Sequence, residues 1–307
     1  MTPSPDVDDI ARKVNNWGRW GSDDEIGTLN LITDAVRARA AASVRTGRAF
    51  SLALPLSMRE GIQMGFVPGR VNPLRTMVML NTPHGDQGLA WNDDVVVMGL
   101  QAATHWDGLA HASWKGSLYN GFDASSVTVD GASKLGIHRV GTLLSRGVLL
   151  DVARALGVER LEAGYAITSA DLDAAVALAA TDVMPGDIVL VRTGQMAHLR
   201  AGDKVAYSYP APGLTAGTAV WFHDHDVAAV ATDTLIFEVY PSEDPSQELP
   251  VHRLHLVEMG MTQGQNWVLD GLAEDCAVDG VYEFLLDASP LPFTNACGSP
   301  VAPIALK

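Results

Sequence analysis

The most informative stretch of the chain is residues 101–111, which read QAATHWDGLAH. It follows an apolar run, residues 93–100, that predicts a buried strand, so its reactive side chains begin where a rigid element ends. His105 and Asp107 stand two residues apart. Because side chains at this spacing in an extended segment project from the same face, we expect the two to converge on one point.

Two further polar residues share this parity. Gln101 and His111 lie four residues before and after His105, although the chain must bend after Asp107 to bring His111 inward. Imidazole nitrogens, carboxylate oxygens and amide oxygens can all ligate zinc or manganese, and such an ion acidifies bound water. The spacing alone leaves an alternative open, in which His105 and His111 are buried, hydrogen-bonded histidines near a strand end.

Outside this stretch the pattern is mixed. Apolar runs predict strands at 49–54, 75–80, 148–151, 187–192 and 227–232. Capping residues and periodicity predict helices at 33–44, 169–180 and 218–225, and three glycines and two prolines make 61–73 a loop. Strands that alternate with helices, together with hairpin-like strand pairs, favour one mixed α/β domain over a regular doubly wound sheet.

Composition narrows the class of partner. The 36 acidic and 21 basic residues give a formal net charge of -15, which repels nucleic acid and anionic membranes and favours a small-molecule substrate. No apolar run approaches the roughly 20 residues that would span a bilayer. The acidic N-terminus lacks the features of a secretory signal, so we expect a cytoplasmic protein. Cys276 and Cys297 are too few for a disulfide framework.

The motif also resembles a known signature. Thr104, His105, Asp107 and His111 match His-x-Gly-Thr-His-x-Asp-x-Pro-x-His, the mark of the cyclase family that includes bacterial kynurenine formamidase and isatin hydrolase. The chain departs from it at three positions, which are Gln101, Ala103 and Leu109. The resemblance extends to residues 233–234, 249–252 and 298–304.

This resemblance implies a fold and an assembly. The expected architecture is an α/β fold of the β/β/α, kynurenine formamidase-like type, with a mixed sheet and a barrel-like core. Residues 46–307 would form the catalytic domain, and residues 1–45 an N-terminal arm packed on it. It also implies a homo-oligomer, either a dimer or a tetramer.

The resemblance further implies a ligand set. His105, Asp107 and Gln265, with Gln101, would hold a divalent ion, manganese or zinc, with magnesium as a further option. His111 and His252 would act as catalytic acid or base. Because Gln101 and Gln265 are neutral and leave Asp107 as the anionic ligand, one ion is favoured over two. The stretch from His252 to Gln265 is one residue longer than in the small formamidases.

Aromatic residues near the motif suggest a substrate pocket. We expect Trp106, Trp114, Tyr119 and Phe66 to line it, although each fits the core as well, and Phe66 also fits a loop packed at an oligomer interface. The expected activity is hydrolysis of a cyclic amide, lactone or formamide by metal-activated water. Two alternatives stay open: a metal-dependent cyclase or lyase, and a non-catalytic binding protein with a decayed metal site.

Overall fold

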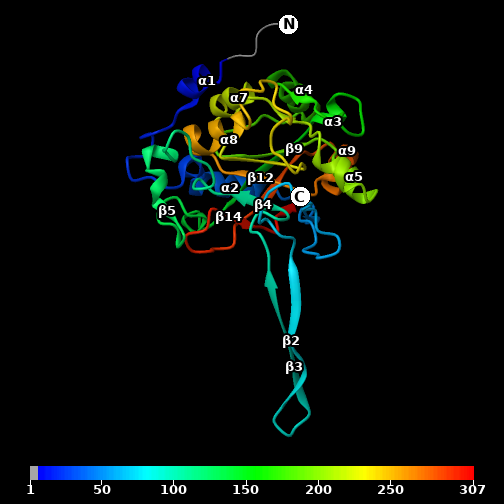
Figure 1. Ribbon diagram of the computed structural model, residues 1–307. Helices are drawn as coiled ribbons and strands as arrows, with labels where there is room; N and C mark the ends of the chain where they lie inside the picture. The colour runs from blue at the N-terminus through cyan, green and yellow to red at the C-terminus, as the bar shows by residue number, and fades with distance from the viewer. Residues whose placement is uncertain (1–5) are drawn as a thin grey trace.

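A nine-stranded mixed sheet forms the centre of the computed structural model, which describes residues 6–307 (Figure 1). Its strand order is β1-β15-β13-β7-β9-β11-β12-β4-β14. The middle four strands run parallel: β7 (Leu144–Asp151), β9 (Ile188–Arg192), β11 (Ala229–Thr232) and β12 (Gln263–Gln265). The flanking strands pair antiparallel: β1 (Ala49–Ser51), β15 (Ile304–Leu306), β13 (Glu283–Asp287), β4 (His105–Asp107) and β14 (Gly298–Pro300).

Helices cover both faces of this sheet. Because successive strand residues point to opposite faces, Val148 and Leu150 join one core cluster and Leu149 the other. On the first face lie α1 (Val7–Val14), α3 (Val152–Ala155), α4 (Ser169–Ala179), α7 (Thr218–Asp224), α8 (Pro250–His252) and the π-helix η5 (Arg253–Met259). On the second lie α2 (Asp34–Ala42) and α9 (Asp270–Asp279). The predicted mixed α/β fold is confirmed.

Shorter elements connect these layers. The helices α5 (Met196–Arg200) and α6 (Lys204–Ser208) follow β9. Two small pairs of strands lie outside the main sheet: β8 (Ala166–Ile167) with β10 (Gly213–Leu214), and β5 (Val127–Thr128) with β6 (Gly131–Ala132). Helix α4 begins in a capping box, in which Thr168 and Asp171 each accept a hydrogen bond from the other's backbone N–H.

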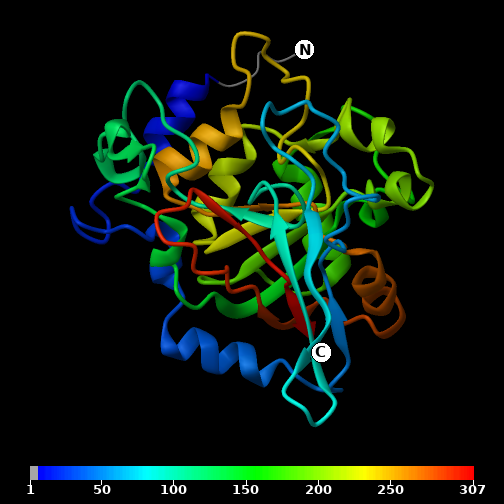
Figure 2. The ribbon, with the colours of Figure 1, turned by 60° about the horizontal axis from the view of Figure 1, so that its bottom comes forward.

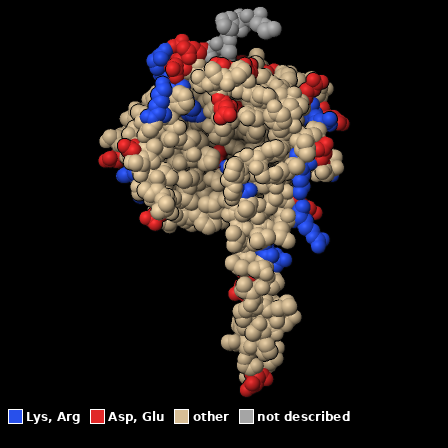
Figure 3. Space-filling model, viewed as in Figure 1, with Lys and Arg blue, Asp and Glu red and all other residues tan. Residues whose placement is uncertain are grey.

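A long hairpin leaves the body as an arm. Strands β2 (Leu74–His84) and β3 (Leu89–Val97) pair only with each other and project away from the sheet in Figure 1, toward the viewer in Figure 2. Uncharged residues cover most of this arm (Figure 3). The prediction for 93–100 was right in that a strand runs through Val97, but its burial was wrong. The Val95-Val96-Val97 run has the composition of a core strand, but all three side chains are exposed.

The N-terminal segment packs on the π-helix. The Asn16 amide donates to the Met259 carbonyl at 3.0 Å, and the Trp17 indole N–H donates to the Val257 carbonyl at 2.7 Å. These contacts concern residues 6–45, because residues 1–5 of the expected arm lie outside the described range. Within residues 6–307, every helix is too short or too polar to cross a bilayer.

A buried ion pair ties β7 to the loop before β9. The Arg146 guanidinium donates to both carboxylate oxygens of Asp187, at 3.0 and 2.6 Å, and to Glu283 at 2.7 Å. Asp187 is fully buried, so water cannot stabilise its charge.

Removing that cation should destabilise the whole domain. We expect Arg146→Ala to lower the free energy of unfolding by about 3 kcal/mol, because the buried Asp187 carboxylate then keeps only the partly exposed Arg39, at 3.1 Å, as a cationic partner. Urea denaturation followed by circular dichroism measures this. As a control, Arg37→Ala breaks the solvent-exposed Arg37–Asp34 pair and should cost less than about 1 kcal/mol. Equal midpoints for the two variants would contradict the prediction.

Candidate active site

Strand β4 carries the motif between two neighbours. Gln265 of β12 lies opposite His105, and Gln263 of the same strand lies opposite Asp107. Side chains at paired positions share a face, so His105, Asp107 and the two glutamines all project toward the π-helix. Trp106 points to the opposite face, where it packs edge-on against Trp267.

Asp107 is the charge at the centre of this group. Its carboxylate is fully buried and accepts a hydrogen bond from the Gln265 amide at 2.8 Å. Three imidazoles surround it: the Nε2 atoms of His105 and His111 lie 3.4 and 3.6 Å from Oδ1, and His252 Nε2 lies 3.9 Å from Oδ2. Burial would raise the pKa of Asp107, but His111, His105 and His252 hold it well below its usual range.

A backbone carbonyl on the Nδ1 side holds the His105 ring in place. Its Nδ1 lies 2.7 Å from the Ala103 carbonyl, so Nδ1 carries the proton and Nε2 is left as an acceptor. Thr104 holds the motif to its neighbours, because its hydroxyl donates to the Asn266 carbonyl at 2.6 Å and accepts from the Leu54 amide. Thr104 is one of the residues that carry the family resemblance. The structural role of Thr104 is to fix the strand.

His252 is oriented by a residue that the sequence did not reveal. Glu238, also buried, accepts hydrogen bonds from the Val251 and His252 backbone N–H groups at 2.7 and 3.0 Å and from His252 Nδ1. Burial lowers the pKa of His252, but the hydrogen bond and charge of Glu238 outweigh it and raise the pKa above the ordinary value. The ring therefore directs Nε2 toward Asp107 and Gln265.

Another histidine, His255 of the π-helix, is buried and neutral. His255 packs edge-on against Phe222 and Phe237, and burial lowers its pKa to about 3. Its ring nitrogens and the Gln263 Oε1 atom have no hydrogen-bond partner within residues 6–307. The Gln263 amide nitrogen lies 3.4 Å from Asp107 Oδ2, so Gln263 stands between His255 and the central carboxylate.

The donor atoms of the site fit a divalent ion. His105 Nε2 and Asp107 Oδ1 are buried, lack a hydrogen-bond partner in the described chain and lie 3.4 Å apart, close to the roughly 3.3 Å that separates two ligands about 2 Å from one tetrahedral ion. Within residues 6–307, no three His, Cys, Asp or Glu side chains form a ready-made metal cluster. The Gln265 amide lies beside Asp107, and its place as a third ligand stays a prediction.

Gln101 lies beside this group. A Cβ at Gly298 would stand 2.6 Å from its amide nitrogen, so the amide packs directly over Gly298, the cross-strand neighbour of Asp107. Its place among the metal ligands stays a prediction. The same contact explains why this position of β14 is a glycine.

A cavity of about 520 Å³ opens above the site. His111, His252 and Gln265 line one part of it. Most of the rest is apolar or aromatic, and is formed by Phe66, Val67, Tyr209, Leu235, Tyr240 and Leu249. Such a combination of a few polar groups and apolar walls is typical of small-molecule sites.

Three of the four expected pocket aromatics lie elsewhere. Trp106 is fully buried in the second core cluster, with its indole N–H donating to the Ala288 carbonyl. Tyr119 is buried under Gly260, with its hydroxyl on Asp24. Trp114 is covered by the Arg253 guanidinium, 4.2 Å from the ring centroid. Only the placement of Phe66 agrees with the cavity wall.

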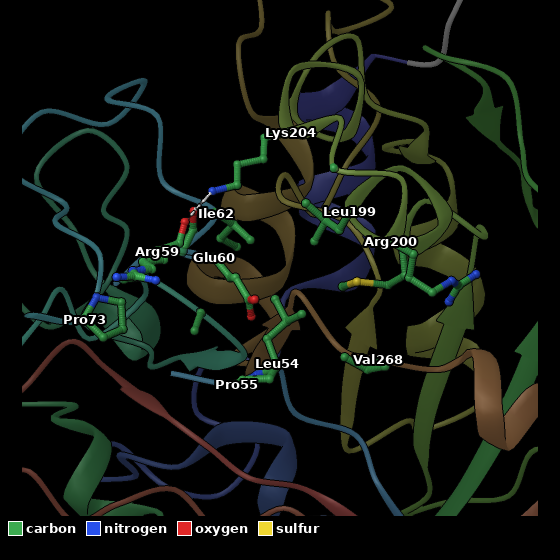
Figure 4. A pocket seen from close by; sticks show the side chains of 15 residues that line it. Leu54, Pro55, Arg59, Glu60, Ile62, Pro73, Leu199, Arg200, Lys204 and Val268 are labelled. Carbon is green, nitrogen blue, oxygen red and sulfur yellow. Dashed lines mark hydrogen bonds between the residues drawn. The ribbon is translucent and has the colours of Figure 1, made fainter. Parts of the chain in front are cut away.

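Another cavity, of about 420 Å³, lies near Ala102 and Ala103 (Figure 4). Leu54, Ile62, Leu199 and Val268 give it apolar walls, and it shares no lining residue with the first cavity. One of its cationic lining residues, Lys204, donates to the Arg59 and Gly61 carbonyls at 3.2 and 2.8 Å. Lys204 thus anchors the loop that leads to the arm.

Comparison with known proteins decides the family. A family model described as "putative cyclase" matches residues 36–239. A crystal structure described as a novel cyclase has 38% identity, a TM-score of 0.88 and coverage of 97% of this chain and 99% of that one. The chain belongs to the cyclase family.

More distant cyclase-fold structures share the architecture. Isatin hydrolase A from Labrenzia aggregata has 17% identity and a TM-score of 0.63, covering 89% of this chain and 98% of its own. A "predicted metal-dependent hydrolase" from Bacillus stearothermophilus has 16% identity and a TM-score of 0.53, covering 84% and 97%. A search among curated proteins found no significant match.

The Glu238 contacts of this cyclase-family site can be tested directly. Glu238→Ala should lower the free energy of unfolding by about 2–4 kcal/mol and speed amide hydrogen exchange at Val251 and His252, because it leaves their buried N–H groups without an acceptor. Hydrogen exchange followed by mass spectrometry or NMR measures this. Glu238→Gln keeps an oxygen acceptor and should lose less. Unchanged exchange in Glu238→Ala would show that the capping role is wrong.

Proposed function

We propose that this cyclase-family member is a metal-dependent hydrolase of a cyclic amide, lactone or formamide. The single observation that carries the proposal is the pair of buried, unpartnered ligand atoms, His105 Nε2 and Asp107 Oδ1, beside His111, His252 and Gln265, which line a cavity. Leaving a carboxylate oxygen and an imidazole nitrogen buried without partners is costly, and a bound cation removes the cost.

The proposed ion is held by His105, Asp107 and Gln265. When bound, a divalent ion supplies Lewis-acid polarisation of a carbonyl and acidification of water. With neutral Gln265 and a single carboxylate, the site carries charge for one ion, manganese or zinc. Descriptions of fold neighbours as metal-dependent hydrolases agree with this proposal.

The chain's own proton-transfer groups are His252 and His111. Glu238 holds the proton of His252 on Nδ1, which leaves Nε2 free to accept a proton at the cavity surface. His111 approaches Asp107 from another direction and lines the same cavity. We assign one of the pair to removing a proton from the attacking water and the other to protonating the leaving nitrogen or oxygen.

The metal itself is the first point to test. Protein purified without chelator should contain about one manganese or zinc ion per chain, and Asp107→Ala should lose it, because Asp107 is the anionic ligand. Elemental analysis by plasma mass spectrometry measures the content. The matched control is Asp94→Ala on the arm, which should keep its metal. Equal metal content in Asp107→Ala and wild type would reject the ligand assignment.

The type of reaction is tested by the source of oxygen. Turnover of a cyclic amide or lactone in ¹⁸O-labelled water should place one labelled oxygen in the product carboxylate, because hydrolysis takes its oxygen from solvent. A cyclase or lyase would leave the product unlabelled. Mass spectrometry of the product separates the two outcomes, and either result is independent of which ion is bound.

A further inference from the structure

The cavity contains a cation that the reaction described above does not use. Arg70 lines it together with His111, His252 and Gln265. Among residues 6–307, its guanidinium has no hydrogen-bond or ion-pair partner, whereas the other partly buried guanidiniums of Arg146, Arg192 and Arg253 all contact carboxylates. Burial lowers the pKa of Arg70, and the charge of Asp107 opposes this shift.

The surrounding backbone holds Arg70 in this place. Its amide donates to the Val67 carbonyl at 3.2 Å, and the next residue, Val71, accepts a hydrogen bond from the Gly99 amide at 3.0 Å. A Cβ at Gly99 would stand 3.1 Å from Arg70 Cγ, so the glycine leaves room for the arginine stem. The segment that presents the guanidinium is thus fixed to the segment that leads into the motif.

The positive charges in the cavity favour an anionic ligand. A divalent ion on one carboxylate leaves one positive charge, and Arg70 adds another. The acidic residue of the cavity lining, Glu248, is exposed to solvent, while Glu238 is already paired with His252. Apolar walls exclude water and strengthen a charge-assisted contact, and the planar guanidinium matches a carboxylate in a bidentate pair.

We propose that Arg70 binds a carboxylate of the substrate, so that the enzyme acts on an apolar or aromatic compound bearing a carboxylate group. This inference rests on the proposed function, because it takes the cavity to be the substrate site. Its test requires neither turnover nor a bound metal. Arg70 is a binding residue in this scheme and takes no part in proton transfer.

The test compares a carboxylate with its uncharged amide. Calorimetric titration of chelator-treated and manganese-loaded protein with benzoate and benzamide gives both affinities. We expect Arg70→Gln to weaken benzoate binding about ten- to a hundredfold in both forms and to leave benzamide binding unchanged. Arg70→Lys should fall between, because lysine lacks the bidentate fork. Arg75→Gln, on the arm, should bind like wild type.

The outcomes separate this inference from the proposed function. Equal benzoate affinity in Arg70→Gln and wild type, equal loss of benzamide and benzoate binding, or no benzoate binding by wild type at about 10 mM would each overturn the Arg70 role. Failure to take up metal would reject the proposed function but leave the chelator-treated titration valid.

Discussion

The buried negative charge of Asp107 imposes a condition on every element around it. An ionised carboxylate without solvent is stable only when cations or hydrogen-bond donors surround it. Strands β4 and β12 and helix α8 meet at this point. Gln265 of β12 donates a hydrogen bond to the carboxylate, while His105 of β4 and His252 of α8 place imidazole nitrogens 3.4 and 3.9 Å from it. Glu238 then satisfies the helix end and the far side of the His252 ring.

Much of this arrangement follows from sequence pattern. Short apolar runs located the parallel strands β7, β9 and β11, and Asp171 and Asp173 near the start of an alanine-rich segment located α4, because these signals are local. The two-residue spacing of His105 and Asp107 also predicted a shared face. The same parity places Trp106 on the opposite face, so its expected role in the pocket conflicted with the argument for its neighbours.

Other features had no local signal. The Val95–Val97 run has the composition of a core strand, and only the tertiary structure shows that it lies in a projecting arm. Glu238 and Arg70 are single charged residues in irregular segments, and their roles depend on contacts far along the chain. The segment from His252 to Gln265, which was expected to be one residue longer than in the small formamidases, contains the π-helix. A π-helix holds more residues per turn than an α-helix.

The arm joins the body at a short, hydrogen-bonded pair of segments. Its two strands leave and return at Val71 and Gly99, which are hydrogen-bonded to each other, with Arg70 on one side and the motif two residues beyond the other. Any contact that bends or fixes the arm acts on this short joint. A change in the direction of the arm would therefore act next to Arg70 and would move this cation relative to the cavity that it lines.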